Sequence, residues 1–298
     1  MGRLYYNNEQ EDPAEFCSAL AIGDSWFWYP NQNMMETLVR DHRTSDDHAN
    51  VRLIGYNGAE LQQYVGAGKY AKMVEHWLSP NFNDGFSEFY ISGAGNDAVD
   101  YSLALRPNCA QYTAAADCFD PAGLETLLGR ISSALGSLIH DIRWAYRNDH
   151  LTRPIFIHGY DYPTPDGRGF ELGPVTAGPW LAPAMDNCHV KTDMALRCAI
   201  MRILIDHLNE DVFKPFDTPG NEVVHIDSRG TLRAYPAAYE KDWTNELHPT
   251  SKGFAKIFDQ CWVPKLAKYR IVNVPATPAM IASLNAKGTA STANGARR

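Results

Sequence analysis

The chain has 298 residues, enough for one large α/β domain or two small ones. Hydrophobic residues make up 45% of it and charged residues 21%, which is usual for a globular protein. The formal net charge is -8 and no basic stripe is present, which argues against a binding surface for nucleic acid or anionic lipid.

The N-terminal residues and the cysteines bear on the compartment. The start of the chain has no apolar segment typical of a secretory signal peptide, and no stretch approaches the roughly 18 apolar residues of a membrane span. The six cysteines include no C-x-x-C pair, which argues against a zinc site. Cys109 and Cys118 bracket one loop and could form a disulfide, but reduced, partly buried thiols in a cytoplasmic protein are the simpler interpretation. Export by a route without such a signal stays open.

Apolar runs that predict strands alternate along the chain with amphipathic stretches that predict helices. In chain order, the expected elements are a strand at 17–22, a helix at 26–42, a strand at 51–55, a helix at 60–78, a strand at 88–92, a helix at 121–148, a strand at 154–158, a helix at 191–212, a strand at 223–226 and a helix at 250–269. Such alternation predicts a parallel sheet with helices on both faces. We therefore expect an α/β, flavodoxin-like three-layer sandwich whose five strands have the order 2-1-3-4-5.

Two connections and the C-terminal segment stand apart from this pattern. The segments 100–120 and 160–189 are longer than ordinary connections, and loops of that length are often functional. Both follow strands, so both should lie over the same edge of the sheet. From 274 to 298 small and polar residues dominate, which predicts a disordered tail after one domain at 1–273.

Polar groups that follow different predicted strands should meet at one edge of the sheet. Ser25 follows the first strand, Gly58 the second and Asn96 the third, and His248 lies after the fifth. The carboxyl ends of parallel strands share one edge, where ligands collect in open α/β sheets. A serine hydroxyl, an imidazole and amide donors are the groups that acyl transfer requires.

Each of these residues also has an ordinary structural interpretation. Ser25 could cap the helix that follows it, His248 could be an exposed surface histidine, and Gly58 could belong to a tight turn. A serine hydroxyl reacts only with the help of a base, and oxyanion donors contribute about 3 kcal/mol each. The convergence of all four groups on one edge favours the catalytic interpretation.

With these residues in view, the chain resembles the SGNH (GDSL-type) hydrolases. The resemblance covers roughly 17–270 and rests on Gly-Asp-Ser at 23–25, Gly58, Gly-Asn-Asp at 95–97 and His-Pro at 248–249. It implies an ester hydrolase that needs no cofactor and no metal. Ser25 would be the nucleophile and His248 its base, with the Ser25 N–H, Gly58 and Asn96 as oxyanion donors. No G-x-S-x-G motif occurs, so the nucleophile turn of the α/β-hydrolases is absent.

Two positions depart from the family pattern. Ala94 stands where the third block usually begins with glycine, which we expect to be a minor change. Asn245 stands where the family has an aspartate, three residues before the histidine. An asparagine can accept a hydrogen bond from the imidazole Nδ1–H, but it provides no charge. We expect Asn245 to orient His248; Glu246, Asp242 or a backbone carbonyl are the alternatives.

Further side chains are expected around this site. Asp24 and Asp97 should support the two loops by accepting backbone N–H groups. Aromatic and histidine side chains that follow the first and fourth strands should provide the wall of the substrate cleft. The residues expected there are Trp26, Trp28, His158, Tyr160 and Trp180.

The sequence therefore predicts a serine ester hydrolase of the carboxylesterase or lipase type that works through an acyl-enzyme. Its substrate would be a small-molecule, lipid or glycan ester, and no nucleic acid partner is expected. A carbohydrate O-deacetylase or an acyltransferase would use the same residues. A catalytically silent binding module with this fold is the alternative from another class.

Overall fold

A parallel β-sheet forms the centre of the molecule. The computed structural model describes residues 2–12, 15–30, 32–41, 50–149, 151, 153–218 and 220–272. Within these residues the sheet has six strands in the order β1-β3-β2-β4-β5-β8, and all neighbours are parallel. The strands are β1 (Leu4–Tyr6), β2 (Ala19–Gly23), β3 (Val51–Gly55), β4 (Glu88–Ser92), β5 (Ile155–His158) and β8 (Val223–Ile226). Central strands such as β2 and β4 are buried along their whole length, as expected where helices cover both faces.

The predicted fold class and strand order are confirmed, but the predicted number of strands was wrong. The order β3-β2-β4-β5-β8 is the expected 2-1-3-4-5 in chain order. The additional strand β1 pairs with β3 at the edge of the sheet, with Leu4 opposite Val51. Because β1 has only three residues, it carries no periodic pattern that could reveal it in the sequence.

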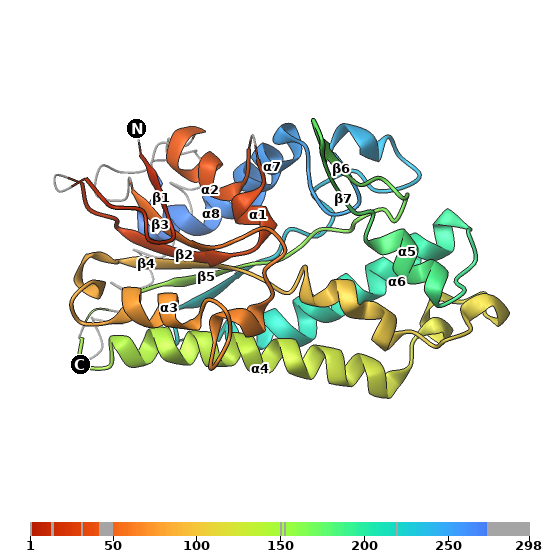
Figure 1. The fold of residues 1–298 in the computed structure, drawn as a ribbon, viewed down its shortest axis with the longest axis horizontal. Coiled ribbons are helices and arrows are strands. Elements are labelled where there is room, and N and C mark those ends of the chain that lie inside the picture. The colour runs from red at the N-terminus through yellow and green to blue at the C-terminus, as the bar shows by residue number, and fades with distance from the viewer. Residues whose placement is uncertain are drawn as a thin grey trace, which may run out of the picture.

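Helices cover both faces of the sheet (Figure 1). α3, α4 and α6 lie on one face, and α2, α7 and α8 lie on the other. Their bounds and those of the remaining helices are α1 (Ser25–Trp28), α2 (Met34–Glu36), α3 (Ala71–Leu78), α4 (Pro121–Ala145), α5 (Leu181–Asn187), α6 (Met194–His207), α7 (Ser251–Ile257) and α8 (Val263–Leu266).

Helix α4 shows how local sequence sets an element. Asp120 caps it by accepting a hydrogen bond from the Gly123 N–H at 2.8 Å, and Pro121 occupies the first helical position. Its buried face repeats at helical spacing and includes Leu127, Ile131 and Leu135. The sequence predicted the start of this helix correctly and its end three residues too late.

Two predicted helices are interrupted in the structure. The stretch 26–42 divides into α1, which ends at Trp28 before Pro30, and α2, which continues as a π-helical turn from Thr37 to Asp41. The stretch 60–78 divides into a 3-10 turn at Leu61–Tyr64 and helix α3, and Gly66 adopts a φ of +58° between them. The interruption of the first stretch leaves α1 as a single helical turn, which changes the direction of the aromatic side chains that follow Ser25.

The two long connections contain short elements of their own. The first begins with a 3-10 helix at Asp97–Ala104. The second contains an antiparallel hairpin of β6 (Phe170–Leu172) and β7 (Val175–Ala177), and then α5. Figure 1 shows this hairpin beyond the sheet, on the side where β2 leads into α1.

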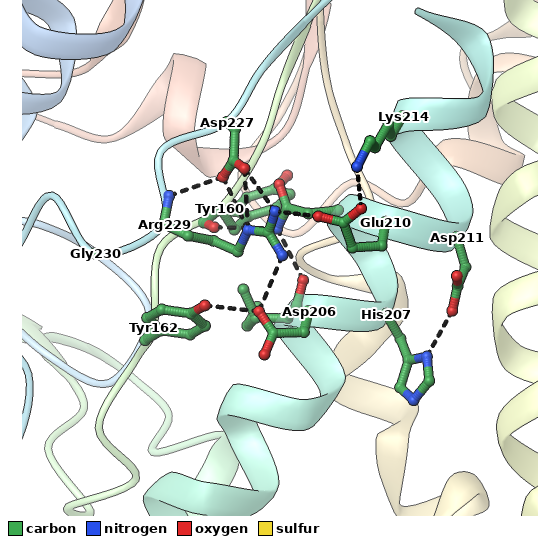
Figure 2. A network of polar contacts seen from close by, with 12 residues as sticks. Tyr160, Tyr162, Asp206, His207, Glu210, Asp211, Lys214, Asp227, Arg229 and Gly230 are labelled. Atoms are coloured by element: carbon green, nitrogen blue, oxygen red, sulfur yellow. Dashed lines mark hydrogen bonds and ion pairs between the residues drawn. The ribbon is translucent and has the colours of Figure 1, made fainter.

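A polar network holds the segment after β8 against α6 (Figure 2). The Arg229 guanidinium donates to Asp206 at 3.0 Å, to Glu210 at 2.6 Å and to Asp227 at 2.6 Å. The Tyr162 hydroxyl donates to the same Asp206 at 2.6 Å. These contacts fix the chain as it leaves β8 on its way to the residues around 245–248.

Three further expectations concern cysteines, the tail and the membrane. Cys109 and Cys118 are free, buried thiols, so the possible disulfide is not formed. The tail expected at 274–298 lies outside the described residues. Among the helices that the structure describes, none combines the length and the apolar character needed to cross a membrane.

Candidate active site

Ser25 begins helix α1 directly after strand β2. The cap of this helix is Asp24, whose Oδ1 accepts the Trp26 N–H at 3.0 Å, so Ser25 itself does not fill the capping role. Its hydroxyl instead lies 2.7 Å from Nε2 of His248. The hydroxyl is therefore in hydrogen-bond contact with the imidazole that follows it by 223 residues in the chain.

The His248 imidazole is buried, with 5% of the residue exposed. Burial lowers its pKa from 6.5 to about 3 because the charged form loses its hydration. The ring is therefore neutral near pH 7, with one nitrogen free to accept a proton. Since Nδ1 faces an amide oxygen, Nδ1 carries the hydrogen and Nε2 is the acceptor toward Ser25.

Asn245 holds the other side of the imidazole. Its Oδ1 lies 3.0 Å from His248 Nδ1 and also accepts the backbone N–H groups of Leu247 and His248, each at 2.9 Å. Its Nδ2 donates to the Tyr29 hydroxyl at 3.2 Å. These contacts distinguish the oxygen of the amide from its nitrogen, so the side chain presents an acceptor to the imidazole.

The alternative orienting carboxylates lie elsewhere. Glu246 accepts hydrogen bonds from the backbone amides that begin α5 and from the Gly167 N–H, at 2.7 to 2.9 Å. Asp242 forms a paired contact with the Arg233 guanidinium. Both carboxylates are therefore engaged by other groups, and the partner of His248 Nδ1 is the Asn245 side chain.

Tyr29 is a site residue that sequence reasoning did not find. Its ring stacks on the His248 imidazole, with ring centroids 4.2 Å apart and an angle of 19° between the planes. Burial raises the pKa of its hydroxyl to about 12, so this group is neutral. The residue lies in the aromatic run after Ser25, but only the early end of α1 brings it to the imidazole.

Gly58 and Asn96, the predicted oxyanion donors, line one cleft together with Ser25. Gly58 has a φ of +79°, a conformation that favours glycine, in the loop after β3. Asn96 follows β4, and its side-chain amide is held by a hydrogen bond from Nδ2 to the Ala59 carbonyl at 2.9 Å. Both residues line the same cleft as Ser25 and His248. The Ser25 N–H adds a third donor, since the first N–H groups of a helix have no partner within the helix.

Asp24 and Asp97 support the two loops that carry these groups. Asp24 accepts the Ser92 hydroxyl at 2.8 Å and the Tyr160 hydroxyl at 2.6 Å, in addition to the helix-capping N–H. Asp97 accepts the backbone N–H groups of Leu61 at 3.0 Å and Ala94 at 3.2 Å. Burial raises the pKa of both carboxyl groups, that of Asp97 to about 6.

A cleft of about 440 Å³ opens over Ser25 and His248. Its walls include the aromatic rings of Tyr29, Tyr56 and Trp180, and the β6–β7 hairpin contributes Phe170 and Val175. Trp180, which was predicted to face substrate, lines this cleft and meets the His248 ring edge-on at 5.8 Å. The hairpin thus forms one side of the cleft.

The other predicted substrate-wall residues do not line this cleft. Trp28 packs against Tyr6 at the start of the chain instead. His158 is fully buried, receives the Trp262 indole N–H at 3.2 Å, and has its pKa lowered to about 3 by burial. Trp26 and Tyr160 lie beneath Ser25, around a second, smaller cavity. The prediction overlooked that β5 ends with His158 inside the core and that α1 is a single turn.

Among the described residues there is no cluster of three or more histidine, cysteine, aspartate or glutamate side chains placed to hold a metal ion.

Searches against known proteins add a comparison of folds. No family model matches the chain. No curated protein matches it either. Solved structures that are similar include a lipase from a goat rumen metagenome, which is 12% identical over 82% of this chain and 94% of that chain, with a TM-score of 0.47. Phospholipase A1 from Streptomyces albidoflavus is 15% identical over 85% of this chain and 99% of that chain, with a TM-score of 0.44. A carbohydrate esterase of family 3 from Talaromyces cellulolyticus is 12% identical over 86% of this chain and 98% of that chain, with a TM-score of 0.43. At these identities the likeness concerns the fold alone.

Proposed function

We propose that the protein is a serine ester hydrolase of the SGNH type, of the carboxylesterase or lipase kind. The observation that carries the proposal is the chain of contacts from Ser25 Oγ to His248 Nε2 at 2.7 Å and from His248 Nδ1 to Asn245 Oδ1 at 3.0 Å. A hydroxyl, a neutral imidazole and a group that orients the imidazole are the parts that nucleophilic acyl transfer needs.

The proposed reaction has two steps. Ser25 Oγ attacks the ester carbonyl while its proton passes to His248 Nε2, and the negative oxygen is held by the Ser25 N–H, Gly58 N–H and Asn96 Nδ2. The bond to the alcohol then breaks, and the alcohol leaves with the proton from His248. A water molecule, activated by the same imidazole, releases the acid from the acyl-enzyme and restores the Ser25 hydroxyl.

Covalent labelling tests this proposal directly. A fluorophosphonate probe should label the folded protein at one position, and peptide mass spectrometry should identify that position as Ser25. Ser25→Ala should abolish both the labelling and the hydrolysis of nitrophenyl esters. A folded wild-type protein that stays unlabelled beside a reactive serine hydrolase would support the catalytically silent binding module instead.

Two related activities would use the same residues. A carbohydrate O-deacetylase would hydrolyse acetylated sugars in preference to nitrophenyl esters. An acyltransferase would pass the acyl group to an alcohol instead of to water, so adding alcohols should then increase the rate of ester consumption. Measuring the rates on all of these substrates with one enzyme preparation distinguishes the esterase, deacetylase and acyltransferase activities.

A further inference from the structure

Two cavities meet at Ser25. The first is the cleft of about 440 Å³ that His248 lines, and the second is a cavity of about 40 Å³ that also has Ser25 in its lining. Ser25, Asn96 and Leu247 line both. An ester bound at Ser25 has two substituents on its carbonyl carbon besides the carbonyl oxygen, an acyl chain and an alcohol, so each cavity can accommodate one of them.

The position of His248 decides which substituent occupies which cavity. The alcohol oxygen must receive a proton as its bond to the carbonyl carbon breaks, and the donor is His248 Nε2. His248 lines the wide cleft but is absent from the lining of the small cavity. The alcohol therefore lies in the wide cleft, and the acyl chain enters the small cavity.

We propose that the small cavity is an acyl pocket that restricts the enzyme to esters of short, uncharged acyl groups of about two to four carbons. This inference rests on the proposed function and adds its substrate class. About 10–15 Å³ of such space holds one water, so about 40 Å³ holds roughly three groups the size of a water molecule, which matches a short acyl chain. Longer chains have no room in it.

The lining of the small cavity fits an apolar chain. Helix α6 contributes Met201 and Ile205, and Leu208 follows directly after its end. The 3-10 helix at Asp97–Ala104 contributes Ala98. All four residues are buried in the hydrophobic core. An acidic acyl group would lose its hydration here without finding a counter-charge, because the two carboxylates that line this cavity, Asp24 and Asp161, carry the same sign as the acyl group.

The wide cleft fits a larger alcohol. Tyr29, Tyr56 and Trp180 offer aromatic surfaces that can stack on a planar or sugar-like group. During the reaction the bond between the acyl carbon and the alcohol oxygen breaks, the bond to Ser25 Oγ forms, and the serine proton leaves with the alcohol through His248. The acyl group then remains in the small cavity until water releases it.

A series of nitrophenyl esters from acetate to dodecanoate tests the proposal. We expect kcat/KM to be highest between acetate and butyrate and at least tenfold lower for octanoate. Ile205→Ala should enlarge the cavity and move the preference toward longer chains. Ile200→Ala is the matched control, because it shortens a buried side chain of the same helix that does not line the cavity.

A second variant keeps the test informative if Ile205→Ala does not fold. Ala98→Leu should fill the cavity and lower the rate with butyrate more than the rate with acetate. Activity on octanoate as high as on acetate, or identical chain-length profiles for Ile205→Ala and Ile200→Ala, would overturn the acyl pocket while leaving the esterase intact. Failure to hydrolyse any ester would overturn the proposed function itself.

Discussion

The imidazole of His248 is held by an amide where a carboxylate would have provided charge. Its Nδ1 faces Asn245 Oδ1 at 3.0 Å, and burial lowers its pKa to about 3. An imidazole accepts a proton only above its pKa, because below that value it is already protonated. The base should therefore remain competent in acid, where a histidine of ordinary pKa would have lost its function.

This leads to a prediction about pH. The acid limb of kcat/KM should lie well below pH 6 for the wild-type protein, while Asn245→Asp should move it to higher pH, because an adjacent negative charge favours the protonated imidazole. Both profiles should be measured with one ester, with tryptophan fluorescence at each pH to verify that the protein is folded. A wild-type limb near the ordinary histidine pKa would contradict the effect of burial.

Asn245→Ala completes this series. It removes the orienting oxygen but leaves both Ser25 and the imidazole, so it should lose less activity than Ser25→Ala. Equal losses would instead mean that orientation by Asn245 is indispensable.

Tyr29 should contribute through its ring and through its hydroxyl, and two substitutions separate these effects. Tyr29→Phe keeps the ring over His248 and removes only the acceptor of the Asn245 Nδ2 hydrogen bond. Tyr29→Leu also removes the aromatic face, which can stabilise a positive imidazolium by about 0.5–2 kcal/mol.

For Tyr29→Leu we therefore expect kcat to fall by up to about thirtyfold and the acid limb to move to still lower pH. Tyr29→Phe should retain most of the activity. Equal kcat values and equal pH profiles for the two variants would rule out a role for the aromatic face.

Ser25 and Asn96 closely follow predicted strands, and parallel topology alone brings such positions to one edge of the sheet. In the structure both line one cleft with His248, which lies 22 residues beyond the last strand and whose place depends on the packing of the segment between them. The directions of side chains within a short helix or at the end of a buried strand depend on packing. That is why Trp28 and His158, which were expected at the substrate cleft, lie against Tyr6 and inside the core.

Ala94 shows a similar limit. Its replacement of glycine was expected to be minor, yet its φ is +90°, a conformation that glycine adopts more easily. The sequence gives the residue type but not the backbone angle that makes the substitution costly.

At the scale of elements, Glu246 connects the histidine segment to the hairpin side of the cleft. Its carboxylate is fully buried and accepts the N–H groups of Gly167, Trp180, Leu181 and Ala182. Negative charge at the start of α5 is favourable, because the first N–H groups of a helix lack partners within the helix. One side chain thereby fixes both ends of the segment that contains β6 and β7.

Glu246→Gln should weaken this connection. The amide nitrogen of glutamine would face N–H groups and leave buried donors without acceptors, so the free energy of unfolding should fall by about 3 kcal/mol. Urea unfolding measures this change, and hydrogen exchange should show faster exchange for the amides of 167–182. The control is Glu240→Gln, which removes the same charge from an exposed side chain. Equal stabilities of the two variants would contradict the role assigned to Glu246.

The hairpin itself could not be predicted from the sequence. Its strands have three residues each, and β7 is exposed along its length, so neither carries an alternating apolar pattern. The length and composition of 160–189 nevertheless indicated a segment over the site, and Trp180 in it does line the cleft.

At the scale of the whole molecule, the order of the strands followed from alternation of elements and from the handedness of their connections. These rules concern long-range topology and do not depend on the details of packing. These rules did not predict the edge strand β1, because its neighbour β3 lies 45 or more positions away in sequence and no helix directly follows β1 in the chain.

The separation of 223 positions between the hydroxyl and the imidazole has a consequence for biosynthesis. Contacts this distant in the chain form late, since loop closure must precede them. A nascent polypeptide on the ribosome, even with its first four central strands complete, carries a serine without a base. In the mechanism we propose, the serine gains its base only when the last strand and the segment beyond it have emerged and docked, so the unfinished chain would not yet hydrolyse esters.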